Sequence, residues 1–205
     1  SYTELPIKGY LSYMTGDAQR LFPPNDVDFA YYKDGTTLNN PEQFNFRRNK
    51  IIESLEKRPE VVSPLSIHNP LYKYLSALEK SKKENKPLLV VFTGYGAVNA
   101  LKMKENIYPR DPINTMLNKV YTVVHLYVDD REQLKQPILS QDGRTLKTKG
   151  QCWATFQATN FKAQSQPYFV ILNSREEVLT LPRGYTSDAK SFETFLKEGI
   201  EAYNE

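Results

Sequence analysis

The segment KPLLVVFTGYGAVNALKM, residues 86–103, carries the strongest structural signal in this chain of 205 residues. Its apolar run from Leu88 to Phe92 has the length and composition of a strand that is buried on both faces. A turn with two glycines, Gly94 and Gly96, follows the run. The residues from Ala97 onward then favour a helix. The segment therefore predicts a buried strand, a tight turn and a helix in direct succession.

The residues around this segment extend the pattern. Leucines at helical spacing predict a preceding helix, capped by Asn69 and ending near Asn85. The elements predicted downstream are a short helix around 113–117, a buried strand at 121–128, an exposed loop or loose hairpin at 137–150, a helix at 153–161, a strand at 167–172 with a hairpin partner at 178–181, and an amphipathic last helix that begins near Ser187 or Asp188. A strand–helix–strand unit, a hairpin and a closing helix form the thioredoxin arrangement, an α/β fold.

Residues 1–68 differ from the rest. Pro, Gly, Asn and Asp recur there as turn residues, and only the stretch from Pro41 to Leu55 has the pattern of a helix. We therefore expect an irregular, partly helical N-terminal extension at 1–68 and a thioredoxin-like domain at 69–205.

Composition narrows the classes of function. The net charge of +3 is close to balance and no dense basic tract is present, so we expect no nucleic-acid partner. No apolar run has the length of a membrane span, and the N-terminus lacks the pattern of a signal peptide, although Ser1 in place of Met is compatible with trimming. Cys152 is the single cysteine and there are two histidines, so we expect neither a metal site nor a cofactor.

The turn and helix start at 94–100 are where a thioredoxin site places its chemistry. A nucleophilic thiolate sits at the helix N-terminus, where the helix dipole lowers its pKa, and a second cysteine one turn later resolves the mixed disulfide. A proline that opens another strand, most often with a cis peptide bond, faces both. Pro167 is the candidate for that proline, with Gln166 before it. Ala97 and Ala100 occupy the two cysteine positions, so neither thiol step is possible.

Residues 86–103 resemble the active-site segment of the C-terminal, thioredoxin-like domain of bacterial DsbD-type thiol:disulfide interchange proteins, which commonly reads FTGYGCVNCRKM where this chain reads FTGYGAVNALKM. The resemblance covers about residues 70–200 and includes the segments Leu126–Asp130, Phe156–Gln157, Gln166–Tyr168 and Pro182–Thr186.

This resemblance implies a periplasmic protein-disulfide reductase domain. In the full-length protein, such a domain can be tethered to the inner membrane. Its implied partners are periplasmic thioredoxin-like proteins or an extended peptide, with a membrane electron-donor domain. Ala97, Ala100 and Pro167 stand at the catalytic positions, and Tyr95, Gly96 and Gln166 at substrate-binding positions. Tyr95 either covers the site or packs within the turn.

Two explanations account for the alanines: deliberate substitution of both cysteines, or natural loss. Val91 lies where thioredoxin-type sites often keep a buried carboxylate, and Leu101 replaces the usual basic residue. Because engineering has no reason to change either position, both favour natural loss.

A rival interpretation is a non-catalytic module that grips extended peptide by β-type hydrogen bonds beside Pro167. A third is a structural domain of a larger surface assembly. Among the remaining polar candidates, we expect Cys152 to be a partly buried structural thiol, His125 a core or sheet-face residue, and Asp129 and Asp130 turn formers rather than metal ligands.

Overall fold

The computed structural model describes residues 71–139 and 144–205. Residues 73–129 and 165–205 form one compact unit, and residues 130–164 belong to a second. The helix predicted at 41–55 and the boundary predicted at 68/69 lie outside the described residues, so both stay predictions.

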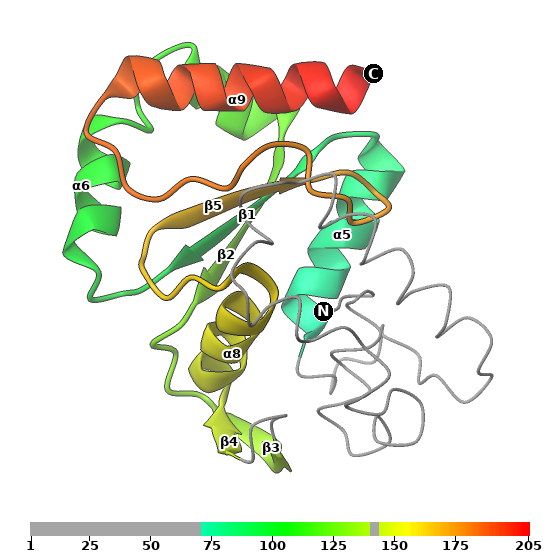
Figure 1. Ribbon diagram of the computed structural model, residues 1–205, viewed down its shortest axis with the longest axis vertical. Helices are drawn as coiled ribbons and strands as arrows, with labels where there is room; N and C mark the ends of the chain where they lie inside the picture. The colour runs from blue at the N-terminus through cyan, green and yellow to red at the C-terminus, as the bar shows by residue number, and fades with distance from the viewer. Residues whose placement is uncertain (1–70, 140–143) are drawn as a thin grey trace. The chain divides into compact units, whose positions relative to one another are not determined.

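The first unit is built around a three-stranded sheet. Strand β1 (Leu88–Thr93) lies between β2 (Thr122–Tyr127) and β5 (Tyr168–Leu172), as Figure 1 shows. β1 runs parallel to β2 and antiparallel to β5. All residues of β1 and β5 are buried, which explains why both read as continuous apolar runs without alternation.

Helical residues supply the crossover that the parallel pair β1 and β2 requires. Helix α6 (Val98–Asn106) follows β1, and α7 (Ile113–Thr115) continues into a π-helical segment, η2 (Met116–Val120), before β2 begins. The prolines at 109 and 112 separate α6 from α7, because a proline ring cannot continue a helix from the preceding turn. The Asp111–Pro112 peptide bond is cis.

One face of the sheet packs against α6, α7 and the last helix, α9 (Ala189–Asn204). Phe169 lies at the centre of an aromatic group, with ring centroids 4.8 Å from Phe192 and 6.4 Å from Phe195. Burial of each such side chain contributes about 1.5–3 kcal/mol to folding. The residues of this core are Leu89, Val91, Met103, Ile107, Ile113, Met116, Tyr121, Phe169, Ile171, Phe192, Phe195 and Leu196.

Helix α5 (Tyr72–Glu84) lies on the opposite side of the sheet from α9 (Figure 1). It buries Tyr74, Leu75 and Leu78, the helical spacing that the sequence predicts. The helix ends at Asn85, whose φ of 55° is the left-handed conformation typical of a helix C-terminus. The Lys86 N–H donates to the Ser81 carbonyl at 3.0 Å and closes the last turn.

Residues 130–139 and 144–164 of the second unit contain a two-stranded antiparallel sheet and one helix. β3 (Gln133–Leu139) pairs with β4 (Thr145–Thr148), so the segment predicted as a loop or loose hairpin is a hairpin whose first strand begins earlier. Helix α8 (Lys149–Phe161) begins four residues before the predicted start at 153. A capping box explains this: the Gln151 N–H donates to the Thr148 hydroxyl, and the Thr148 N–H donates to the Gln151 side chain, both at 3.1 Å.

Two predictions about strands were wrong. The predicted hairpin partner at 178–181 is no continuous strand. Phe169 pairs with Arg183, and Leu172 pairs with Val178. The two paired residues are three positions apart on β5 but five positions apart in the segment 178–183, so this segment bulges. Pro182 lies in that bulge and has no N–H for a ladder. β2 is not fully buried either, because its burial alternates and His125 is exposed.

The first unit thus contains β1–α6–β2 with a parallel crossover, an antiparallel β5 and a closing α9 on the α6 side. This is a thioredoxin-like α/β fold, as the sequence predicts. Among the described residues, none of the helices is both long enough and apolar enough for a membrane span.

At Gly199, α9 approaches Ile171 of β5 and Tyr121 closely. A Cβ atom there would overlap the Ile171 side chain and the Tyr121 hydroxyl. That hydroxyl donates to the Leu196 carbonyl at 2.6 Å, which limits its freedom to move away.

Replacing Gly199 with alanine should therefore lower the free energy of unfolding by about 1–3 kcal/mol, the usual cost of overpacking. In an open helix position the same change stabilises by about 1 kcal/mol. Urea denaturation of Gly199→Ala, with the exposed Glu201→Ala as control, measures the difference. A stabilised Gly199→Ala protein would show that α9 does not lie this close to β5.

Candidate functional site

Strand register brings three loops to one edge of the sheet. Phe92 pairs with Leu126 of β2 and with Tyr168 of β5. Because β1 and β2 are parallel, their C-terminal ends lie at the same edge, and antiparallel β5 has its N-terminal end there. Residues 93–97, 128–129 and 166–167 therefore lie at this edge, which includes the start of α6.

The turn between β1 and α6 is bound by Asp129. The Asp129 Oδ1 accepts a hydrogen bond from the Tyr95 N–H at 2.9 Å, and its Oδ2 accepts one from the Gly96 N–H at 3.0 Å. A side chain at position 94 would bring its Cβ to 3.2 Å from this carboxylate, which is tighter than an ordinary contact, so glycine suits the close approach there. A backbone bond from Ala97 N–H to the Gly94 carbonyl, at 3.1 Å, completes the turn.

Ala97 and Ala100 differ in their exposure. Ala97 is the N-cap residue of α6, with extended backbone angles and no side-chain cap, and it is half-buried. Ala100 lies one turn later and is buried. Access is one of the factors that set the rate of thiol–disulfide exchange, so position 97 suits an attacking thiol better than position 100 does. The methyl groups at both positions supply no thiol.

Pro167 is buried at the start of β5, and the Gln166–Pro167 peptide bond is cis. The returning chain pairs beside it: the Phe169 N–H donates to the Arg183 carbonyl at 2.7 Å, and the Arg183 N–H donates back at 3.1 Å. A Cβ atom on Gly184 would lie 3.9 Å from the Pro167 carbonyl oxygen. Because of this short distance, Gly184 and the Gln166–Pro167 segment lie at the same edge of the sheet. Gln166 is half-buried there.

Tyr95 both packs and remains accessible. Its ring centroid lies 3.9 Å from that of Tyr127 on β2, and the residue is 67% exposed. The Lys73 ammonium lies 5.2 Å from the Tyr127 ring centroid. Further exposed apolar residues near this edge are Val98, on the first turn of α6, and Tyr185, next to Gly184.

Two further positions considered for proton transfer near the α6 start are apolar. Val91 is buried within the core of the sheet face, and Leu101 is 45% exposed on α6. Neither offers a carboxylate or a base for proton transfer at the helix start.

The two aspartates are turn formers, as the sequence predicts. Asp129 binds the turn at 95–96, and the Asp130 Oδ1 accepts a hydrogen bond from the Glu132 N–H at 2.8 Å. Within residues 71–139 and 144–205, no cluster of three or more His, Cys, Asp or Glu side chains could hold a metal ion. The sequence argument missed the contact of Asp129 with Tyr95 and Gly96. A carboxylate directly after a strand parallel to β1 is the signal that could have found it.

Cys152 and His125 lie in very different surroundings. Cys152 is fully buried in α8, and burial raises the pKa of its thiol to about 12. His125 is exposed on β2, which agrees with the sheet-face position predicted for it and not with the core position. Its pKa is lowered first by neighbouring atoms that remove part of its hydration, then by the positive charges of Lys73 and Lys104.

Comparison with known proteins adds two structures. An oxidoreductase, DsbH, is 17% identical, with a TM-score of 0.48 over 63% of this chain and 82% of its own. A disulphide isomerase from Xylella fastidiosa Temecula1 is 14% identical, with a TM-score of 0.39 over 70% of this chain and 96% of its own. No protein-family model and no curated protein matches the sequence. Likeness of this degree assigns no activity, substrate or partner to the chain.

The Cys152 thiol should not react in the native protein. With a pKa of about 12, about one thiol in ten thousand is ionised at pH 8, and the side chain is shielded. Ellman's reagent should therefore label the native protein no faster than it unfolds. The guanidinium-denatured protein should react fully, which is the control. Rapid labelling of the native protein would contradict a buried thiol.

Replacing Asp129 with alanine should free the amides of Tyr95 and Gly96. Because both bonds go to an exposed carboxylate, we expect a loss of about 1–2 kcal/mol in stability. Hydrogen exchange at these two amides should accelerate while exchange within β1 changes little. Asp130→Ala is the matched control, since Asp130 binds only the nearby Glu132 amide among the hydrogen bonds given above. Equal exchange in both variants would exclude the role of Asp129.

Proposed function

We propose that this chain is a thioredoxin-like domain related to the DsbD-type thiol:disulfide interchange proteins, and that in its present form it binds an extended polypeptide without exchanging disulfides. The observation that carries the proposal is the pair Ala97 and Ala100 at the start of α6, on the sheet edge that also holds the cis Gln166–Pro167 bond. We infer from these positions the scaffold of a dithiol site that lacks its two sulfur atoms.

The chemistry follows from what alanine lacks. In disulfide reduction, a thiolate attacks one sulfur of the substrate, a mixed disulfide forms and one substrate thiol leaves. A second thiolate then displaces the other substrate sulfur, and the enzyme becomes oxidised. Position 97 would carry the first step and position 100 the second. With methyl groups at both, neither bond can form.

The binding role rests on the groups that remain. Pro167 opens β5 at an edge where an extended segment can add β-type hydrogen bonds. Tyr95, Val98 and Tyr185 are exposed at or near this edge and offer apolar and aromatic contact area. A partner of this kind is an extended stretch of polypeptide, as in a periplasmic thioredoxin-like protein.

Natural loss of the cysteines explains the neighbouring positions better than deliberate substitution does. Val91 is buried and Leu101 is apolar and exposed, so the proton-transfer groups are missing together with the thiols. We place the domain in the periplasm on the resemblance alone, with a membrane electron-donor domain as a partner of the ancestral, cysteine-containing form.

Restoring both cysteines should restore the reaction. The Ala97→Cys/Ala100→Cys protein should reduce insulin with dithiothreitol as the electron source, at a rate at least tenfold above that of the unchanged chain. The rate of insulin precipitation measures this. A double variant that folds but gives no rate enhancement would contradict an intact dithiol scaffold.

The two single variants are matched controls. Ala97→Cys should form a stable mixed disulfide with oxidised insulin, because position 97 is half-buried and no resolving thiol is present. Ala100→Cys should not, because position 100 is buried. Mass spectrometry of the non-reduced proteins distinguishes these results. Equal trapping by both variants would refute the assignment of an outer and an inner position.

A further inference from the structure

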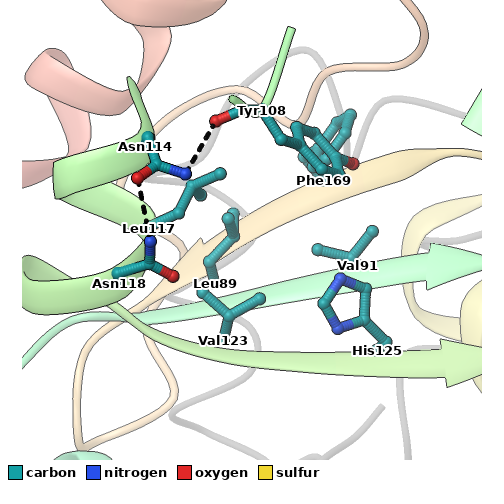
Figure 2. A pocket seen from close by; sticks show the side chains of 9 residues that line it. All are labelled: Leu89, Val91, Tyr108, Asn114, Leu117, Asn118, Val123, His125 and Phe169. Carbon is teal, nitrogen blue, oxygen red and sulfur yellow. Dashed lines mark hydrogen bonds between the residues drawn. The ribbon is translucent and has the colours of Figure 1, made fainter. Parts of the chain in front are cut away.

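A cavity of about 180 Å³ lies on the sheet face that packs against the helical segment 113–120, away from the loops at the strand ends. Figure 2 shows its side chains directed toward a common space from β1, β2, β5 and the helical segment. The cavity is lined by Leu89, Val91, Tyr108, Asn114, Leu117, Asn118, Val123, His125 and Phe169.

The floor of the cavity is apolar and firmly held. Leu89, Val91 and Phe169 are buried, and the register places Val91 between His125 and Phe169. The Tyr108 and Phe169 rings meet edge to face, with centroids 6.5 Å apart. A dry apolar cavity of about 150 Å³ in another protein accommodates benzene, so the present volume admits a single ring with one small substituent.

The rim of the cavity is polar, and hydrogen bonds fix the orientation of its asparagine side chains. The Asn114 amide nitrogen donates to the Tyr108 carbonyl at 3.3 Å, and the Asn118 amide nitrogen donates to the Asn114 Oδ1 at 3.1 Å (Figure 2). Within the described part of the chain, neither the Asn118 Oδ1 nor the His125 ring has a hydrogen-bond partner. Leu117 and Asn118 both belong to η2, a π-helical conformation that is rare and often found at functional sites.

The absence of charged groups in the cavity lining favours an uncharged ligand. No carboxylate, ammonium or guanidinium group lines the cavity. Burial together with Lys73 and Lys104 keeps the pKa of His125 below its ordinary value, so its ring is neutral near neutral pH and offers one donor and one acceptor. A charged ligand would lose hydration on this apolar floor without a charged group in the lining to replace it.

We propose that this cavity binds a small uncharged aromatic molecule of the phenol class, with its ring on the floor of Leu89, Val91 and Phe169 and its hydroxyl at His125 and Asn118. Val91 is the one lining residue that we also considered for proton transfer at the α6 start, and none of the lining residues is at positions 95–100 or 166–167.

Phenol itself is the probe, titrated into the full chain and followed by methyl and amide chemical shifts. We expect a Kd on the order of 1 mM, as suits a ligand of seven heavy atoms. Nuclear Overhauser contacts should connect phenol protons to Leu89, Leu117 and Val123. Toluene should bind at least fivefold more weakly, since it cannot bond to His125, and benzoate more weakly still. Tighter binding of benzoate, or equal binding of toluene, would overturn the class of ligand.

Two variants test the location. Leu117→Trp should fill the cavity and weaken phenol binding at least tenfold, whereas Leu181→Trp, the same change at an exposed position, should leave it unchanged. His125→Leu should abolish the preference for phenol over toluene. If Leu117→Trp fails to fold, the nuclear Overhauser contacts between phenol and the unchanged protein test the location instead. Absence of contacts to Leu89 and Val123 would refute the site.

Discussion

The pairing of β1 with a strand on each side sets the positions of the other elements in the unit formed by residues 73–129 and 165–205. Leu88 to Phe92 pair in register with β2 on one side and with β5 on the other. Because every residue of β1 is buried, the backbone pairing to both neighbouring strands holds this register, rather than an alternation of apolar and polar faces. The same register sets the positions of the loops that follow β1 and β2 and precede β5. The candidate site is thus a consequence of how one strand is buried.

Local patterns were sufficient to predict most elements of the described chain. The uninterrupted apolar run at 88–92 and the leucine spacing of α5 each have one natural structural solution, and the structure has both. The start of α8 was missed because its capping box is a pair of side chains, Thr148 and Gln151, whose reciprocal bonds add four residues to the helix. The bulge opposite β5 was missed because the Val178–Leu181 alternation resembles a strand and the effect of Pro182 reaches back beyond its own position.

The contacts that shape the site join residues far apart in the sequence. Asp129 binds the turn at 95–96, and the Tyr127 ring packs against the Tyr95 ring at a tilt, both across more than thirty residues. No periodicity or turn motif encodes such pairs, so the sequence left open whether Tyr95 covers the site or packs. The composition of the helix start, by contrast, was readable directly, because the absence of sulfur at Ala97 and Ala100 needs no geometry.

Because Ala97 and Ala100 carry no sulfur, the stability of the fold does not depend on the reduction potential of its surroundings. A thioredoxin-type domain with two cysteines exists in two covalent forms whose stabilities differ, so its folding free energy is linked to its reduction potential. This chain has one thiol, and burial keeps that thiol from pairing with another molecule. Its covalent structure is therefore a single one in oxidising and reducing compartments alike. Electron supply therefore does not change the covalent structure of the loops at residues 93–97 and 166–167.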